Sequence, residues 1–478
     1  MEPWGSARAR WTLAAAVLGS GMAFLDGTVV NVALPAMAKD LHADLADLQW
    51  VLDAYLVTLT ALVLLGGALG DRFGRRRVFL LGVIGFSGAS VVCGVAPTTT
   101  TLIGARALQG VGAALLVPGS LALLSATIRD TDRARAIGAW SGLTGVAGAA
   151  GPFIGGWLVD AASWRWAFLI NVPVGLAVVI ACRHVPESLD PDAPRQLDLV
   201  GATVVALGLA SLTAGLIEAG GSWSVATIGA VVIGLGLLGA FVAIEHRSPQ
   251  PMLPLELFRS RQFTGANLVT LAVYAGLGGA FFFVVVNLQG ALGYSALESG
   301  AALTPATLLM LVLSSRMGAL SQKTGPRLPM TVGPAITAIG LALLSQVEAG
   351  DKYVIGVLPG VLVFGLGLSI TVAPLTAAVL GAVDERHLGI GSGTNNAVAR
   401  LAGLLAVAVV PSLAGFELSG GEGSLPGYST AMQISAALAL AGAVIAFTTI
   451  GRGRRVMPVT APIFQPCHDP ALADARHQ

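Results

Sequence analysis

The residues best suited to chemistry in this chain are two carboxylates and an arginine that interrupt long apolar runs. Asp26, Asp53 and Arg106 lie within the first, second and fourth of these runs. An ionisable side chain at the centre of a bilayer costs about 2.5–3.5 kcal/mol, and an arginine keeps its charge at every accessible pH. A carboxylate whose proton affinity is set by a nearby cation can take up and release a proton. We therefore predict a proton-coupling site formed by Asp26, Asp53 and Arg106.

The depths of the three residues agree with this grouping. With a rise of 1.5 Å per residue, Arg106 and Asp26 lie roughly 8 Å from the outer ends of their runs, and Asp53 lies about 5 Å from the outer end of its own. A structural ion pair without a role in function would also explain a buried arginine beside a carboxylate. The sequence leaves open whether Asp26 or Asp53 binds the proton.

Further polar side chains are expected to face a central cavity. Gln109 lies one helical turn after Arg106 and therefore on the same helical face. Arg400 lies roughly 18 Å into the thirteenth run, close to the bilayer midplane. The residues predicted to line a substrate cavity are Asn31, Gln109, Asn395, Asn396 and Arg400.

A short turn rich in arginine separates the second and third apolar runs. Residues 67–77 read Gly-Ala-Leu-Gly-Asp-Arg-Phe-Gly-Arg-Arg-Arg, and a turn with this charge cannot lie in lipid. The residues predicted to form a cytoplasmic gating loop are Gly67, Asp71, Arg72, Gly74, Arg75 and Arg76. Asp71 is expected to dock near the N-terminus of the run that starts at Gly389, where a carboxylate is favoured by about 0.3–1 kcal/mol.

Small residues follow one another through the fifth apolar run. Glycines three and four residues apart let helices approach closely, and a proline kinks a helix and leaves a backbone carbonyl without its donor. The stripe consists of Gly148, Gly151, Pro152, Gly155 and Gly156. Close helix packing alone would account for the stripe, and a seal against the other half of the protein is the functional alternative.

The composition places the protein in a membrane. Hydrophobic residues make up 55% of the 478 residues and charged residues 11%, with a mean hydropathy of +0.79, which is too little charge to cover a soluble surface. The net charge of +1 gives no sign of nucleic-acid binding. The three cysteines lack metal-ligand spacing and the six histidines lie in loops or the tail, so we expect no disulfide, metal, cofactor or enzymatic activity.

Fourteen segments are apolar enough to cross a bilayer, which takes roughly 20 residues. They cover residues 12–34, 48–69, 78–96, 101–126, 136–159, 166–181, 199–217, 225–244, 263–288, 297–313, 330–345, 354–375, 389–413 and 430–450. With the N-terminus inside, 21 of the 27 Lys and Arg fall on the cytoplasmic side, as the positive-inside rule requires. We predict an all-α polytopic membrane protein with both termini cytoplasmic.

The segments are arranged as six, two and six. We predict an N-terminal six-helix half at 1–183, a linker with two inserted transmembrane helices at 184–261, a C-terminal six-helix half at 262–450 and a cytoplasmic tail at 451–478. Residues 318–327 repeat the charged turn with Gln322 in place of Asp71. The repeat indicates that the halves arose by duplication, and the neutral Gln322 indicates that gating by this turn is asymmetric.

Four strings in the chain resemble those of one family. Residues 67–77 resemble the signature loop of the major facilitator superfamily, and residues 25–35 resemble the first-helix motif of its fourteen-span drug:proton antiporter family. Residues 102–113 resemble the superfamily motif associated with proton coupling, and residues 148–156 resemble the antiporter motif of its exporters. The resemblance covers nearly the whole chain up to about residue 450. It departs at Asp53, where related sequences often carry a neutral polar residue.

The resemblance implies two six-helix halves of major facilitator type around a central cavity, with two further helices at the side. It implies proton-coupled export of hydrophobic or amphipathic small molecules by alternating access, in a bacterial inner (cytoplasmic) membrane. The implied partners are the substrate, protons and the lipid bilayer, with the chain acting as a monomer. A proton-coupled uptake symporter and a non-transporting membrane sensor are the alternatives.

Overall fold

The computed structural model describes residues 1–189, 197–220, 223–383, 388–418 and 425–451, which contain helices and no β-strand. The first half of the chain forms α1 (Ala7–Leu41), α2 (Leu45–Phe73), α3 (Arg75–Gly94), α4 (Thr99–Thr127), α5 (Asp130–Ala161), α6 (Trp166–Leu169) and α7 (Asn171–Cys182). Next come α8 (Leu199–Glu218), α9 (Val225–Arg247) and the short helix η1 (Leu255–Arg259). The second half forms α10 (Arg261–Gly290), α11 (Ala296–Thr324), α12 (Arg327–Leu344), η2 (Tyr353–Val357), α13 (Leu358–Leu380), α14 (Leu388–Ala414) and α15 (Tyr428–Thr449).

Thirteen helices in the described ranges are long and apolar enough to cross a membrane. Five lie in the first half, two in the insert and six in the second half, so the all-α polytopic fold is confirmed. The sixth predicted span differs, because it forms the shorter apolar segment Trp166–Cys182, which is divided into α6 and α7 at Ile170. Pro173 explains the division, since it has no N–H to donate to the carbonyl of Leu169 four residues before it.

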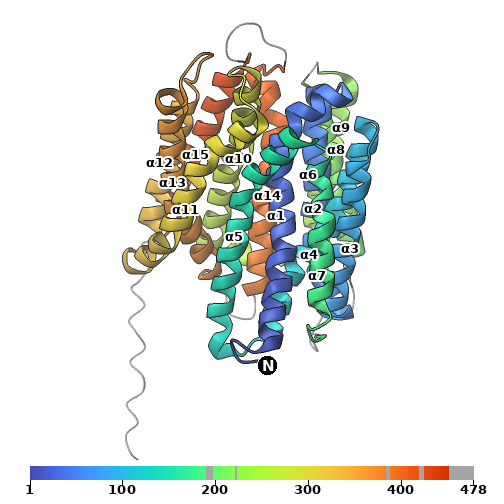
Figure 1. Ribbon diagram of the computed structural model, residues 1–478. Helices are drawn as coiled ribbons and strands as arrows, with labels where there is room; N and C mark the ends of the chain where they lie inside the picture. Colours follow the sequence, from blue (N-terminus) through green and yellow to red (C-terminus); the bar gives the residue numbers. More distant parts are fainter. Residues whose placement is uncertain (190–196, 221–222, 384–387, 419–424, 452–478) are drawn as a thin grey trace, which may run out of the picture.

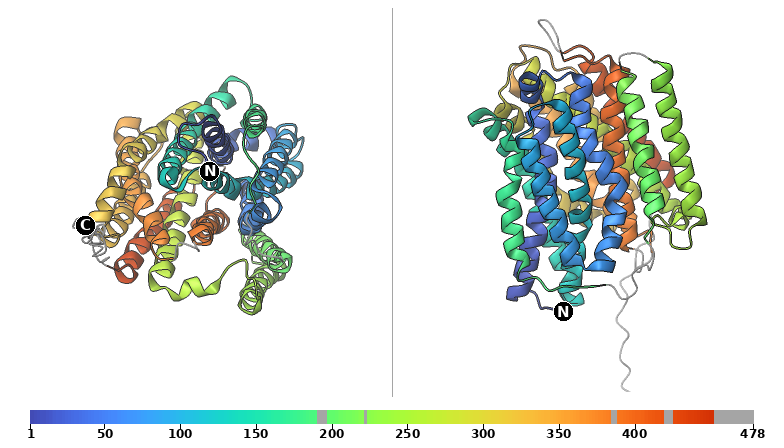
Figure 2. Two further views of the ribbon diagram at one scale, coloured as in Figure 1. Left: turned by 90° about the horizontal axis from the view of Figure 1, so that it is seen from below. Right: turned by 90° about the vertical axis from the view of Figure 1, so that its right-hand side faces the viewer.

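The helices form two bundles that stand side by side (Figures 1 and 2). One bundle contains α1–α7 and the other contains α10–α15. The inserted helices α8 and α9 pair with each other at the edge of the molecule, and α8 packs against α2 and α14. The insert therefore lies at the side of the two halves, as the sequence predicts.

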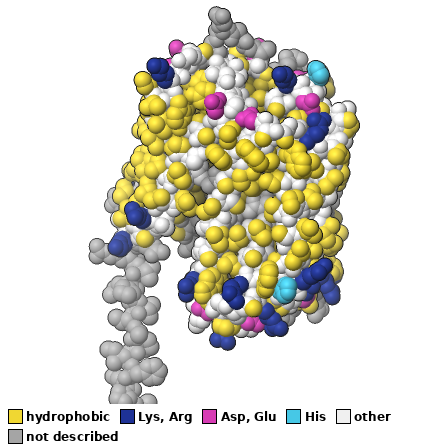
Figure 3. Space-filling view, viewed as in Figure 1, with side chains coloured by type: hydrophobic (Ala, Val, Ile, Leu, Met, Phe, Trp, Pro, Cys, Tyr) yellow, Lys and Arg dark blue, Asp and Glu magenta, His cyan; other side chains and the backbone are white. Residues whose placement is uncertain are grey.

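Charged side chains mark the two ends of the bundle. Apolar side chains cover the middle of the face seen in Figure 3, and Lys and Arg gather at the lower rim, near the N-terminus. We name this rim the basic end; it also carries the turn between α2 and α3. The other rim is the opposite end. An apolar belt between two charged rims is the surface that a bilayer requires.

The hydrophobic core joins the two halves toward the opposite end. One continuous cluster there contains residues of both halves, such as Val29 of α1 and Phe283 of α10. Toward the basic end, the clusters around Phe79 and around Phe263 belong to the first and the second half, respectively. Figure 1 shows that α5 and α11 move apart toward the basic end. The halves are therefore closed together at the opposite end, whereas toward the basic end α5 and α11 separate and α2 stays in contact with α14.

Candidate functional site

A buried ion pair connects α1 and α4. Nη1 of Arg106 lies 2.6 Å from Oδ2 of Asp26, and the two side chains are 1% and 0% exposed. The Nε of Arg106 donates to the backbone carbonyl of Val51 in α2 at 2.9 Å. The structure thus brings together two of the three residues predicted to form the proton-coupling site.

Amide and hydroxyl groups complete the surroundings of Asp26. Its Oδ1 accepts from Nε2 of Gln109 at 2.8 Å and from Nδ2 of Asn171 at 3.0 Å. Both amides also donate to Oγ of Ser90, at 2.9 and 3.4 Å. Residues of α1, α3, α4 and α7 therefore share one buried polar network, and each carboxylate oxygen of Asp26 has a donor. Such a network is sensitive to the loss of any member.

Two aromatic rings flank the guanidinium of Arg106. Its central carbon lies 4.4 Å from the ring centroid of Tyr55 and 5.8 Å from that of Phe168. The faces of aromatic rings attract cations, so these rings stabilise the arginine in a site without bulk water. Sequence reasoning did not assign Ser90, Asn171, Tyr55 or Phe168 to the site.

Asp53 stands apart from the ion pair. It is fully buried on α2, and neither of its carboxylate oxygens has a hydrogen-bond partner among the described residues. A charged carboxylate without a partner is costly to bury, whereas the neutral acid is tolerated. The two carboxylates therefore differ in kind: Asp26 is held by a cation and two amides, whereas Asp53 is buried without a hydrogen-bond partner among the described residues.

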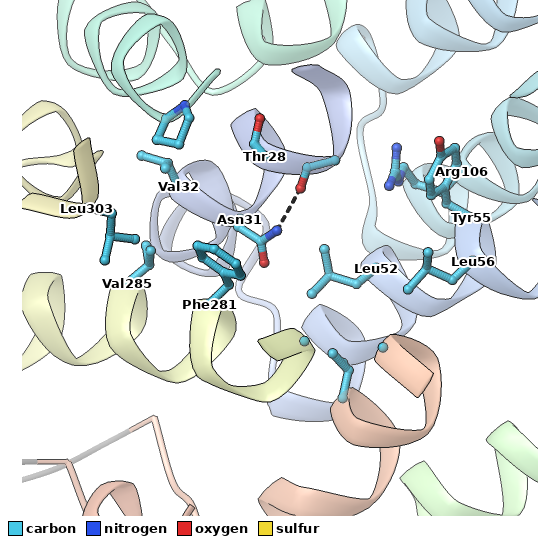
Figure 4. Close-up of a pocket in the computed structure, with 15 residues that line it drawn as sticks. Thr28, Asn31, Val32, Leu52, Tyr55, Leu56, Arg106, Phe281, Val285 and Leu303 are labelled. Atoms are coloured by element: carbon cyan, nitrogen blue, oxygen red, sulfur yellow. Dashed lines mark hydrogen bonds between the residues drawn. The ribbon is translucent and has the colours of Figure 1, made fainter. Parts of the chain in front are cut away.

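A cavity of about 210 Å³ lies between the two halves. Its wall comprises Gly27, Thr28, Asn31 and Val32 of α1, Leu52, Tyr55 and Leu56 of α2, Arg106 of α4, Pro152 of α5, Gly278, Phe281 and Val285 of α10, Leu303 of α11, and Gly403 and Val407 of α14. Figure 4 shows the side chains of Asn31, Leu52 and Phe281 reaching into the space between these helices. The lining is mainly apolar, which suits a hydrophobic ligand.

The predicted cavity residues lie in several different places. Asn31 lines the cavity, and its amide donates to the carbonyl of Gly27 at 2.6 Å. Gln109 is fully buried in the polar network and is absent from the cavity wall. Asn395 joins α14 to α10, with its Nδ2 2.7 Å from Oγ1 of Thr270. Asn396 is exposed and Arg400 is partly buried on the same helix.

The small-residue stripe of α5 contacts both α1 and α11. A β-carbon at Gly155 would lie 2.8 Å from Val29 of α1, and one at Gly151 would collide with Thr28. A β-carbon at Gly156 would lie 2.5 Å from Cα of Leu297 in α11. Gly148 has more room, with Phe24 at 3.8 Å. Close backbone approach thus explains the glycines, and the contact of α5 with α11 joins the two halves.

Hydrogen bonds between the halves close the opposite end. The carboxylate of Asp160, at the end of α5, accepts from the backbone N–H groups of Ala296 and Leu297 at 3.1 and 2.8 Å. These are free donors in the first turn of α11, where a carboxylate is favoured. Nε2 of Gln49 donates to the carbonyl of Val407 at 2.5 Å, and Nε2 of Gln289 donates to that of Val32 at 3.0 Å. No sequence pattern predicts this closure, because each partner is a backbone group.

The predicted gating loop is a tight turn held by its own charges. Gly74 has φ of +110°, a conformation that favours glycine. Oδ1 of Asp71 accepts from Nε of Arg75 at 2.7 Å, and the carboxylate of Glu187 accepts from the backbone N–H of Arg76 at 2.9 Å. Arg72 extends over the ring of Phe73, and Gly67 faces Pro118 of α4.

The structure does not test the expected docking of Asp71. Here Asp71 is paired with Arg75, and residues 384–387, together with the side chains of the first two residues of α14, lie outside the described set. The docking stays a prediction for the conformation closed at the basic end. The repeat has a structural counterpart, since Gly325 has φ of +83° at the position equivalent to Gly74. The side chain of Gln322 lies outside the described set.

Two helical halves that meet at one end and part at the other, around a central cavity, define an alternating-access membrane carrier. The chain belongs to the Major Facilitator Superfamily, whose sequence profile matches residues 16–407. It is similar to the tetracenomycin C resistance and export protein of Streptomyces glaucescens, with 36% identity over 84% of this chain and 74% of that protein. It is 33% identical to the puromycin resistance protein of Streptomyces alboniger, over 92% and 91% of the two chains.

Solved structures agree with this fold. A peptide transporter in complex with sulfate matches with a TM-score of 0.68 at 15% identity, over 93% of this chain and 94% of that one. A D-xylose–proton symporter matches with a TM-score of 0.65 at 14% identity, over 93% and 99%. At this level of identity the likeness concerns the fold alone. The expected family and architecture are confirmed.

Proposed function

We propose that this protein exports hydrophobic or amphipathic small molecules in exchange for protons. The observation that carries the proposal is the buried pair of Asp26 and Arg106, because Arg106 both holds the carboxylate and lines the cavity between the halves. Relatives named for resistance to and export of antibiotics support the direction of transport.

Protonation of Asp26 would change the polar network in a defined way. The neutral acid loses its attraction for the guanidinium, and Arg106 is left with Gln109, Val51 and the aromatic rings. Because the network ties α1 to α3, α4 and α7, this change alters the packing of the first half against the second. A proton taken up from outside and released inside would then drive the carrier between the conformation closed at the opposite end and the conformation closed at the basic end. Asp53 is the alternate protonation site.

We also propose that the protein lies in the cytoplasmic membrane of a bacterium, with both termini and the basic end inside. The distribution of Lys and Arg agrees with this orientation. The chain acts as a monomer with a small-molecule substrate, protons and lipid as partners. It carries out transport and no enzymatic reaction. An uptake symporter is the second candidate, since the same pair serves coupling in either direction.

Everted membrane vesicles test both the coupling and the direction. Respiration acidifies their lumen, so an exporter should accumulate an uncharged apolar probe such as anthraquinone-2-carboxamide inside vesicles that contain the protein, relative to vesicles without it. Nigericin, which collapses the pH gradient, should abolish this accumulation. Extrusion from the lumen would identify an uptake symporter. Accumulation that survives nigericin and valinomycin together, which collapse both the pH gradient and the membrane potential, would rule out proton coupling.

A further inference from the structure

Arg400 is a partly buried cation of the second half that forms no ion pair with the described residues. It lies near the middle of α14, and its Nε is buried with no hydrogen-bond partner among the described residues. The residue ranges of helices α10–α15 contain a single acidic residue, Glu298, which lies in the first turn of α11. A guanidinium has five N–H donors and no acceptor. This arginine therefore has donors available for an anion.

A phenol donor lines the same cavity from the facing helix. Tyr55 of α2 is 3% exposed and lines the cavity, and its hydroxyl has no hydrogen-bond partner in the part of the chain that the structure describes. Helix α2 packs against α14. The hydroxyl of Tyr55 and the guanidinium of Arg400 thus belong to the two helices that flank one region between the halves.

This region adjoins the apolar cavity. Arg400, Gly403 and Val407 are spaced by three and four residues and lie on one face of α14, and the latter two line the cavity. Across from them, Leu52 and Phe281 supply apolar wall. A ligand whose apolar body fills the cavity would extend its polar end toward Arg400.

We propose that Arg400 and the Tyr55 hydroxyl bind the acidic group, a carboxylate or phenolate, of an apolar substrate. A cationic substrate is disfavoured, because Arg400 would repel it and the charge of Asp26 is already matched by Arg106. Charge-assisted hydrogen bonds from arginine to an oxyanion are among the strongest in proteins. This inference deepens the proposed function and rests on it for transport, whereas the binding step stands alone.

Equilibrium binding to the purified, detergent-solubilised protein tests the inference without a pH gradient. The probes are anthraquinone-2-carboxylate and anthraquinone-2-carboxamide, which share shape and size and differ in charge. We expect wild-type protein to bind the carboxylate about tenfold more tightly than the amide. Arg400→Gln should remove this preference and leave amide binding unchanged, and Arg400→Lys should restore part of it. Tyr55→Phe should weaken carboxylate binding several-fold while the protein elutes as a single species on size exclusion.

The outcomes separate this inference from the proposed function. Equal affinity of the wild type for the two probes, saturable binding of neither, or a preference that persists in Arg400→Gln would overturn the acidic-group site. Binding of the expected kind without nigericin-sensitive accumulation in vesicles would overturn the proton-driven export and leave the site in place.

Discussion

Asp26→Asn should reduce nigericin-sensitive export to the level of membranes without the protein, a loss of at least about tenfold. Asparagine has nearly the shape of aspartate, but it cannot take up a proton and it leaves Arg106 without its carboxylate. Removing one partner of a buried ion pair costs about 3–5 kcal/mol, so Arg106→Ala should abolish export as well and should lower the melting temperature more. Export is measured in everted vesicles, and folding by size exclusion and thermal melting.

The same helix offers a matched control. Asp40 of α1 lies 2.7 Å from Arg165, and both side chains are partly exposed. Exposed ion pairs contribute about 0–1 kcal/mol, so Asp40→Asn should keep export near the wild-type rate. Wild-type export by Asp26→Asn would remove this residue from the coupling mechanism. Asp53→Asn, tested in the same way, then decides whether the alternate site carries the proton.

Gly156→Leu should trap the carrier open at the opposite end and lower export by about tenfold or more. Its β-carbon would lie 2.5 Å from Cα of Leu297 and 2.6 Å from the carbonyl oxygen of Ala296. Overpacking of a tight contact costs about 1–3 kcal/mol, and here the cost falls only on the conformation in which α5 and α11 touch. An Asn31→Cys reporter in the cavity should become more reactive to a membrane-impermeant thiol reagent added outside.

Other glycines of α5 provide the comparison. Gly145 and Gly138 have no atom within 4 Å of a built β-carbon, so Gly145→Leu and Gly138→Leu should leave export and labelling near the wild type. Gly151→Leu should impair export through its contact with Thr28 of α1, inside the first half. Full export by Gly156→Leu would mean that the seam between α5 and α11 is not part of the transport cycle.

The pair of Asp26 and Arg106 could be predicted because charges in apolar runs are rare and depth follows from residue count. The tight turn at Gly74 and its counterpart at Gly325 could be predicted from the repeated motif. Gln109 was predicted to line the cavity, but the structure places it inside the polar network, since helical spacing gives a face and not the distance to a neighbouring helix.

The remaining features depend on contacts between helices that no local pattern encodes. Ser90 and Asn171 are single polar residues in apolar segments, and only the packing of α3 against α4 and α7, and of α7 against α1, brings them into the network around Asp26. The bond from Asp160 to the start of α11 joins residues 136 positions apart and uses backbone donors. Under the proposed function, the separation of α5 and α11 at the basic end is one of two states of the same sequence, and a motif does not specify which state is populated.

Under the proposed function, the charge of Asp26 sets the balance between two conformations, one closed at the opposite end and the other closed at the basic end. Spin labels at Thr131 and Lys323, exposed residues near the basic ends of α5 and α11, report this balance as a distance distribution in lipid nanodiscs. In the wild type the distribution should shift with pH, because states with different proton affinities change population as protons bind. In the Asp26→Asn variant, the distance distribution should be the same at every pH and should equal the distribution of the wild type at acidic pH. A variant whose distances shift with pH as the wild type's do would contradict the account.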